Sequence, residues 1–277
     1  MKRRLIQLCA ALLYNLNLKG FAEASIYKGK SKGLCVPGLN CYSCPGAVGS
    51  CPLGTLQNAL SAMDRKLPFY ILGVLLLFGV TMGRTICGFL CPFGLVQELL
   101  YRIPVPKIKK NRVTQELSKV KYVILAVFVV ILPVVFKAAS GLPVPAFCKY
   151  ICPAGTLEGG IPLVLLDDSL SGLAGALFHW KVLVLAVILV SACFLYRSFC
   201  RILCPLGAIY SLFAPVALLG VRIDRDTCVD CGRCVRTCKM DVRQVGDREC
   251  IQCGECMKEC NVDAIYWKKP WDVKSKK

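Results

Sequence analysis

Histidine is almost absent from this 277-residue sequence, in which His179 is the single copy. One imidazole cannot supply both axial ligands of a bis-histidine haem, and the lack of a C-x-x-C-H motif excludes covalent haem attachment. No G-x-G-x-x-G fingerprint is present, so we expect no nicotinamide or flavin bound at a strand–helix turn. We interpret His179 and Trp180 as an interfacial pair beginning an apolar segment, with binding of a quinone headgroup as the alternative.

Acidic residues are also scarce, with 17 Asp and Glu against 35 Lys and Arg and a formal charge of +18. Such a balance can indicate nucleic-acid binding. Here the basic residues lie in connections between apolar segments, as in membrane proteins, so we expect a membrane and a redox partner protein and no nucleic acid. The hydrophobic fraction of 56% also exceeds the roughly 45–50% of soluble domains.

Long apolar runs are missing, since none reaches the roughly 20 residues that a spanning helix needs. Four shorter runs can still span if their polar flanks extend the helix. They cover residues 5–18, 67–83, 122–136 and 182–196. A fifth stretch, residues 205–221, contains Pro215 and predicts an interfacial or re-entrant helix.

The basic residues predict how these runs are oriented. Residues 1–4 carry three Lys or Arg and residues 84–121 carry eight, whereas residues 137–181 carry three. The positive-inside rule therefore predicts a multi-pass inner-membrane protein with the 84–121 connection and both termini in the cytoplasm. We interpret Asp167 and Asp168, in the outer connection, as solvated carboxylates, with proton handling as the alternative.

Cysteine, in contrast, is abundant, with 20 copies in regular groups. Two runs near the C-terminus share C-x2-C-x2-C-x3-C spacing, in which three cysteines hold one [4Fe–4S] cluster and the fourth reaches the neighbouring cluster. Structural zinc, the alternative, favours separated cysteine pairs. Lys239 and Asn261 replace the usual proline after each run and remove no ligand. The predicted ligands are Cys228, Cys231, Cys234 and Cys260 for one cluster and Cys250, Cys253, Cys256 and Cys238 for the other.

A Cys-Pro-x-Gly motif occurs four more times, beginning at Cys51, Cys91, Cys152 and Cys204. Proline suits the first position of a helix, so each motif predicts a cysteine at a helix N-terminus, where free N–H groups stabilise a thiolate or an anionic cluster. Glycine three residues on permits close backbone approach. Free or disulfide-paired cysteines are the alternative, and four copies favour metal ligation. Further cysteines precede these motifs at Cys35, Cys41, Cys44, Cys87, Cys148 and Cys200.

The motifs Cys87-Gly-Phe-Leu-Cys91-Pro and Cys200-Arg-Ile-Leu-Cys204-Pro, with four apolar segments and a double terminal array, resemble NapH/MauN-type membrane ferredoxin proteins. The resemblance implies a polytopic inner-membrane protein that relays electrons from the quinol pool or another membrane donor to a partner oxidoreductase. The extra cysteines between Cys35 and Cys51, and the pair Cys148 and Cys152, depart from the simplest members and weaken an assignment to nitrate reduction.

The expected topology sorts the remaining cysteines by membrane face. Cys9 and Cys193 lie inside apolar runs and are interpreted as packing residues. We expect one cluster at the cytoplasmic ends of two spans and another formed by four of the six outer cysteines. The favoured sets are Cys87, Cys91, Cys200 and Cys204 for the first and Cys44, Cys51, Cys148 and Cys152 for the second.

The expected fold is an α-helical membrane protein with about four spanning helices plus interfacial helices over residues 1–220. A C-terminal α+β domain like a bacterial 2[4Fe–4S] ferredoxin is expected over residues 221–277. The predicted function is single-electron transfer between a membrane donor and a partner oxidoreductase, as a subunit rather than a stand-alone enzyme. The alternatives are a redox-sensing or maturation accessory protein for a metalloenzyme, and a membrane thiol–disulfide relay.

Overall fold

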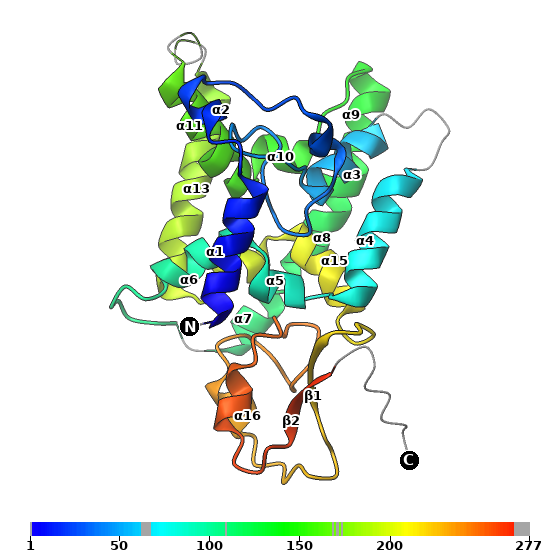
Figure 1. The fold of residues 1–277 in the computed structure, drawn as a ribbon, viewed down its shortest axis with the longest axis vertical. Coiled ribbons are helices and arrows are strands. Elements are labelled where there is room, and N and C mark those ends of the chain that lie inside the picture. Colours follow the sequence, from blue (N-terminus) through cyan, green and yellow to red (C-terminus); the bar gives the residue numbers. More distant parts are fainter. Residues whose placement is uncertain are drawn as a thin grey trace.

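The computed structural model describes residues 2–61, 68–108, 110–167, 169, 172 and 174–268. Asp168, position 67 of the second predicted span and residues 269–277 of the expected C-terminal domain lie outside the described residues. A bundle of helices stands on a small C-terminal module, and the first helix begins at the end of the bundle that faces this module (Figure 1).

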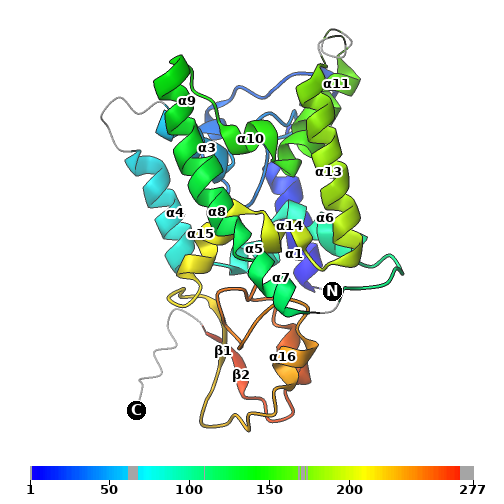
Figure 2. The same cartoon turned by 180° about the vertical axis from the view of Figure 1, so that it is seen from behind.

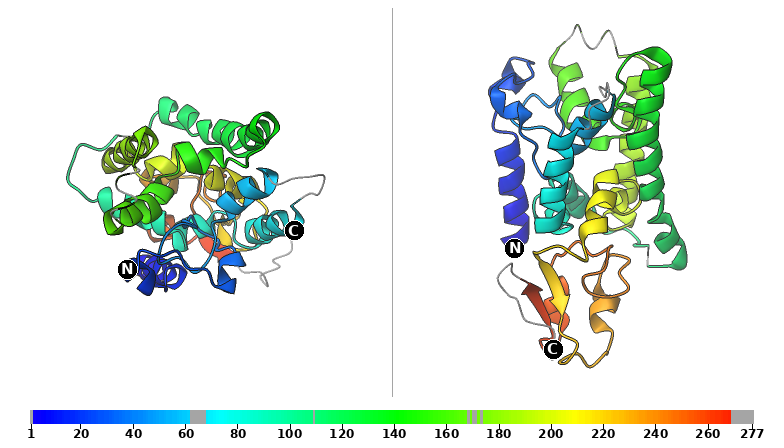
Figure 3. Two further views of the ribbon diagram at one scale, coloured as in Figure 1. Left: turned by 90° about the horizontal axis from the view of Figure 1, so that it is seen from above. Right: turned by 90° about the vertical axis from the view of Figure 1, so that its right-hand side faces the viewer.

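The helices of the bundle fall, in chain order, into a group before residue 101 and a group after residue 111. The first group contains α1 (Lys2–Tyr14), α2 (Lys19–Ala22), η1 (Lys30–Gly33), α3 (Pro52–Ser61), α4 (Phe69–Thr81), α5 (Thr85–Phe89) and α6 (Pro92–Leu100). The second contains α7 (Arg112–Leu117), α8 (Val120–Ile124), η2 (Leu125–Ile131), α9 (Leu132–Ser140), α10 (Ala146–Tyr150), η3 (Gly155–Gly160), α11 (Ile161–Leu166), α13 (Ala176–Phe194), α14 (Ser198–Ile202) and α15 (Pro205–Phe213). Viewed from above, the long helices lie at the periphery (Figure 3).

Two helices among the described residues are long and apolar enough to cross a membrane. They are Arg112–Ser140, which joins α7 to α9, and Ala176–Phe194, and they contain most of the third and fourth predicted spans. Only 17% of the most apolar part of each is buried, unlike the core helix of a soluble protein. The predicted spans at 5–18 and 67–83 form the 13-residue helices α1 and α4.

The Arg112–Ser140 helix contains a π-helical section, η2, which ends two residues before Pro133. Proline lacks an N–H group and its ring clashes with the carbonyl four residues earlier. Wider π-helical turns accommodate this loss without breaking the helix. The predicted fifth helix behaves differently, because α15 ends at Phe213, before Pro215.

Apolar side chains face outward on several helices of the bundle. Phe69, Leu72, Leu76 and Leu77 are exposed on α4; Val123, Val130, Ile131, Val134 and Val135 on the Arg112–Ser140 helix; and Leu183, Val187 and Val190 on α13. The interior contains thiols as well as apolar side chains, because six cysteines are buried in the main core cluster. The cysteine motifs therefore lie inside the bundle, behind an apolar exterior.

The C-terminal module is built around a two-stranded antiparallel sheet. Strand β1 (Gly220–Ile223) pairs with β2 (Ile265–Lys268), with Gly220 opposite Lys268 and Ile223 opposite Ile265. Between the strands lie the two cysteine arrays and the short helices α16 (Arg233–Thr237) and η4 (Glu255–Glu259). The two strands pair the beginning of the module with its end, next to the helical bundle (Figure 3).

Candidate functional site

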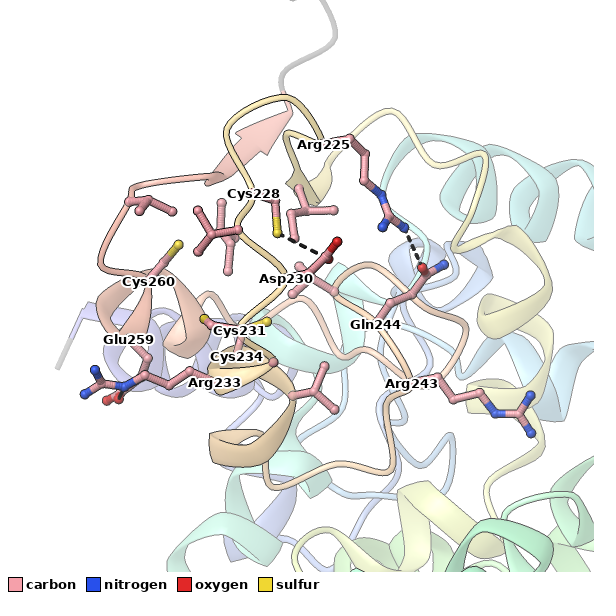
Figure 4. Close-up of a pocket in the computed structure, with 17 residues that line it drawn as sticks. Arg225, Cys228, Asp230, Cys231, Arg233, Cys234, Arg243, Gln244, Glu259 and Cys260 are labelled. Carbon is pink, nitrogen blue, oxygen red and sulfur yellow. Dashed lines mark hydrogen bonds and ion pairs between the residues drawn. The ribbon is translucent and has the colours of Figure 1, made fainter.

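Two pockets in the C-terminal module are each lined by four cysteines. One, the distal group, contains Cys228, Cys231, Cys234 and Cys260 (Figure 4). The other, the proximal group, contains Cys238, Cys250, Cys253 and Cys256. In each pocket the fourth cysteine comes from the other array, so the sulfurs are distributed crosswise between the two runs. This is the arrangement that two adjacent clusters require.

The same backbone turn curls both arrays around their pockets. Asp230 and Gln252, each directly before the second cysteine of its array, have φ of 49° and 57°. Gly232 and Gly254, each directly after that cysteine, have φ of 66° and 74°. Left-handed backbone on both sides of the second cysteine bends the loop toward one centre.

The electrostatics of the proximal group suit a cationic occupant. Burial and the neighbouring thiols raise the pKa of Cys256 to about 12, and burial is the main cause that raises the pKa of Cys238 to about 11. Converged thiols of this kind stay protonated at neutral pH unless positive charge is bound among them. Four thiols around one centre are the donor set of a [4Fe–4S] cluster.

All four Cys-Pro-x-Gly motifs adopt the predicted helix-start conformation. Cys91 and Cys204 are the N-caps of α6 and α15, with proline in the first turn of each helix. The glycine amide donates to the cysteine sulfur in each motif, at 3.3 Å for Gly207 to Cys204 and 3.4 Å for Gly155 to Cys152. The other two motifs repeat this contact. The prediction that each motif places its cysteine at a helix N-terminus, with backbone N–H groups directed at the sulfur, is confirmed.

The structure brings together the four cysteines of the first predicted membrane set. Cys87, Cys91, Cys200 and Cys204, here the inner group, are all buried and lie within electrostatic range of one another. They come from α5, α6, α14 and α15, in the half of the bundle next to the module (Figure 2). Gln97 donates to the Cys200 sulfur at 3.1 Å and accepts the Phe199 amide at 3.0 Å.

Two fully buried arginines flank the inner group, and our sequence analysis did not identify them. Arg84 and Arg197 each precede the first cysteine of a motif by three residues. Their guanidinium groups lie over the glycines of the opposite motifs, with Arg84 3.5 Å from a Cβ built on Gly207 and Arg197 3.2 Å from one built on Gly94. The shared Arg-x-x-Cys-x3-Cys-Pro pattern was the available signal.

Arg84 has one buried donor without a partner. Its Nη2 pairs with Glu249 at 2.8 Å and its Nε donates to the Arg248 carbonyl, whereas Nη1 has no hydrogen-bond acceptor. The guanidinium is within electrostatic range of Cys87 and Cys200. An unpaired cationic donor beside four cysteines fits a cluster in which the four thiolates outweigh the 2+ charge of the [4Fe–4S] core.

The outer cysteines gather differently from the favoured set. Cys51, Cys148 and Cys152 line a cavity of about 540 Å³ together with Cys41, and these four form the outer group. The Cys41 sulfur lies 3.2 Å from a Cβ built on Gly159 and is within electrostatic range of Cys152. Cys44 does not line this cavity, and its thiol donates instead to Asn15 at 3.5 Å. Cys35 donates to Thr55.

A glutamine contact relates the outer group to the inner group. Gln57 follows Cys51 by six residues, as Gln97 follows Cys91. Gln57 donates to the Cys148 sulfur at 3.3 Å and accepts the Phe147 amide at 2.9 Å, which repeats the contacts of Gln97. The two groups therefore share one local framework.

The remaining predicted residues lie away from these groups. Cys193 donates to the Leu189 carbonyl within its helix, and Cys9 is exposed. His179 lies beside the Gly175 carbonyl, and Trp180 is exposed and donates to Tyr150. All twenty cysteines are free thiols. Among the described residues, no three Cys, His, Asp or Glu side chains lie close enough to hold a single metal ion.

Ion pairs and close backbone packing attach the module to the bundle beside the inner group. Glu249 of the module pairs with the buried Arg84 and Lys121, and Asp241 pairs with Arg201. Gly88, next to Cys87, packs so closely that a Cβ would collide with the Ile251 carbonyl oxygen. Ile251 lies between two cysteines of the proximal group, so the inner and proximal groups are neighbours.

Comparison with known proteins gives a family and several relatives. A model described as a 4Fe-4S binding domain matches residues 50–70, 67–111, 122–161 and 176–223, which together exceed half of the chain. An uncharacterized protein of Methanocaldococcus jannaschii is 29% identical over 61% of this chain and 64% of its own length. No solved structure matches.

Two other relatives have more informative names. An Escherichia coli protein named provisionally as an electron transport protein, YccM, is 23% identical over 70% of this chain and 54% of its own. A methylamine utilization ferredoxin-type protein of Paracoccus denitrificans, MauN, is 26% identical over 70% of this chain and 62% of its own. The chain thus spans less than two thirds of the length of each relative. The matched segments contain all four Cys-Pro-x-Gly motifs, and the chain belongs to the 4Fe-4S binding domain family as a NapH/MauN-type ferredoxin protein.

Proposed function

We propose that this protein is a membrane-bound electron relay in which four cysteine groups, each holding a [4Fe–4S] cluster, form one path. A bound cluster supplies reversible one-electron chemistry. The observation that carries the proposal is the order of the groups along the long axis of the molecule. The elements that carry the outer group lie in the half of the bundle farther from the module, and those that carry the inner group lie in the half next to it (Figures 1 and 2). In the module, the proximal pocket is lined in part by Tyr196 of the bundle, whereas the distal pocket is lined by module residues alone.

Contacts between successive groups support a continuous path. Gly88 and Ile251 join the inner group to the proximal group. Within the module, Cys256 of the proximal group is within electrostatic range of Cys234 of the distal group. Each junction is formed by residues that adjoin the cysteines themselves, so no long gap separates these neighbours.

The apolar exterior of the bundle supports a membrane location. Outward-facing Leu, Val and Ile on α4, the Arg112–Ser140 helix and α13 would contact lipid, whereas the module carries charged side chains. We propose the inner membrane, with α1 and α4 as additional shorter spans and both chain ends on the cytoplasmic side. The salt bridge from Arg3 to Glu255 is consistent with both ends sharing a face.

The outer group is the proposed meeting point with a membrane donor. Its cavity is open and lies at the end of the path farthest from the module. A quinol is the proposed donor class, and the distal group would exchange electrons with a partner oxidoreductase. His179 and Asp167 take no part in this scheme.

Iron analysis of anaerobically purified full-length protein tests the proposal. Four clusters correspond to about 16 irons per chain, and a protein with clusters only in the module would contain about eight. Cys204→Ala should remove about four irons and interrupt electron flow, whereas Cys193→Ala, a thiol outside all four groups, should do neither. About eight irons in the parent protein would refute the membrane clusters.

Two other results would support the alternatives. Intact electron flow in Cys204→Ala with a partner enzyme left immature would support an accessory role. Outer thiols that can be alkylated only after reduction would support a thiol–disulfide relay.

A further inference from the structure

The loop of residues 35–40 runs between the two membrane cysteine groups. Leu39 and Asn40 are buried, with 2% and 0% of their surface exposed. The Leu39 amide donates a hydrogen bond to the sulfur of Cys91, which belongs to the inner group. The amide of the next residue, Asn40, donates to the sulfur of Cys51, which belongs to the outer group. Consecutive backbone amides therefore contact both groups.

The loop is fixed in place by two contacts from the inner side. The Tyr210 hydroxyl, from α15, donates to the Pro37 carbonyl at 2.9 Å. Gly38 packs on the start of α6, and a Cβ at this position would lie 3.1 Å from the Leu90 carbonyl oxygen and 3.3 Å from Cys91 Cα. Both neighbouring atoms are backbone, so a Cβ here would require the loop or the start of α6 to shift by a few tenths of an ångström, and glycine permits the approach without that shift.

Tyr210 itself lies between the two groups. Its side chain is fully buried, and its hydroxyl is within electrostatic range of Cys87 and Cys91 on one side and of Cys51 on the other. A buried loop must satisfy its amides, and other amides of this segment do so with backbone carbonyls, as Val36 does with Ser50. Leu39 and Asn40 use sulfurs of two different groups instead.

We propose that the Leu39–Asn40 peptide unit, held by Gly38 and Tyr210, is the electron bridge between the outer and inner groups. The path consists of one hydrogen bond from the Cys51 sulfur, the peptide unit, and one hydrogen bond to the Cys91 sulfur. Electrons tunnel better along covalent and hydrogen bonds than across van der Waals gaps. The inference rests on the proposed function, because both groups must hold clusters.

The proposed transfer moves a single electron between the outer and inner groups. One electron leaves one group, which is oxidised by one unit, and enters the other, which is reduced by one unit. No bond forms or breaks and no proton moves. A quinol-class donor at the outer group supplies the electrons, two per quinol in successive one-electron steps, and releases its two protons there to water, and the module accepts the electrons.

Gly38→Ala tests the bridge, with Gly73→Ala as its control. A Cβ on Gly73, which is exposed on α4, has no atom within 4 Å, whereas one on Gly38 requires the loop and the start of α6 to separate by a few tenths of an ångström. Full-length protein in lipid nanodiscs would receive one electron from a photoreduced deazaflavin, and freeze-quench EPR would follow equilibration between the two groups. We expect Gly38→Ala to slow equilibration several-fold with unchanged iron content, and Gly73→Ala to match the parent.

Tyr210→Phe provides a second variant if Gly38→Ala fails to assemble. It removes only the hydroxyl that fixes Pro37, and equilibration should again slow while the iron content holds. Parent-like equilibration in an assembled Gly38→Ala or Tyr210→Phe protein would overturn the bridge and leave the proposed function standing. A parent protein without EPR signals from the inner and outer groups would overturn the proposed function, and the bridge with it.

Discussion

Replacement of Arg84 by glutamine should lower the reduction potential of the inner group. The Arg84 side chain is fully buried, and its unpartnered Nη1 lies beside the motif glycine Gly207 and within electrostatic range of Cys87 and Cys200. Reduction adds one negative charge to a cluster, and a nearby cation stabilises the reduced form. Loss of Arg84 removes that stabilisation and leaves Glu249 with Lys121 as its remaining partner.

The expected size follows from Coulomb's law. Unit charges 4 Å apart interact by about 4 kcal/mol at an effective dielectric constant of about 20, and by about 2 kcal/mol at twice that distance. A change of about 1.4 kcal/mol corresponds to about 59 mV for a one-electron couple. We take the larger separation, about 8 Å, and its energy of about 2 kcal/mol. The potential of the inner group should then fall by about 85 mV in Arg84→Gln.

EPR-monitored redox titration of the full-length protein measures this shift. Arg84→Lys keeps the charge and should retain most of the parent potential. Arg112→Gln, which removes an exposed arginine at the start of α7, should change nothing. An unchanged inner potential in Arg84→Gln, or equal shifts in Arg84→Gln and Arg84→Lys, would refute the electrostatic argument.

Three further predictions concern the outer group, the module interface and acid stability. Cys41→Ser should cost about four irons per chain and Cys44→Ser none, by iron analysis, because Cys41 lines the outer cavity and Cys44 does not. Glu249→Gln leaves two buried cations without their carboxylate and should lower the stability of the docked module by about 3–5 kcal/mol in urea titrations. Burial acts to raise the pKa of Glu98, but Arg197 and Arg3 outweigh it and lower the pKa to about 2. Because the unfolded value is about 4.3, the stability contributed by Glu98 is present above that pH and is lost as the pH falls toward 2. Urea titrations at several pH values should show a steeper acid loss in the parent than in Glu98→Gln.

The cysteine spacing contains most of the information about the module and the inner group. The two arrays and the Cys-Pro-x-Gly motifs are local patterns in which helix-start chemistry and fixed spacing determine where each sulfur points. The family resemblance drawn from these motifs is confirmed. The span at 122–136 proved to be part of a longer helix, because its first turns carry charged residues that hydropathy excludes. One of them, Lys121, is buried against Glu249 of the module.

The outer group could not be derived in the same way. Cys41 lies in a segment without regular secondary structure. Its sulfur can approach Cys152 because Gly155 and Gly159, which have no side chains, leave space on η3. No periodicity connects residues so far apart in the sequence. By motif position, the equivalent of Cys87 in the outer group is Ala47, so the fourth cysteine has to come from elsewhere. Only the packing of the 35–51 segment on the bundle shows which cysteine this is.

The shared framework of the inner and outer groups makes their differences in charge informative. Counting from the motif cysteines, Cys44 and Pro145 stand where the inner group has Arg84 and Arg197. The outer group has mixed charges instead, because the carboxylate of Glu158 accepts the Cys41 amide at 2.7 Å, Lys181 lines the cavity and Lys32 is within electrostatic range of Cys41. Cations favour the reduced form of a cluster and carboxylates oppose it. The buried guanidinium groups of Arg84 and Arg197 lie over the motif glycines of the inner group, whereas the carboxylate and the lysines offset each other around the outer group, so the inner group should have the higher potential. Electrons would then run downhill from the outer group toward the module, and an outer potential above the inner one in the same titration would reverse that direction.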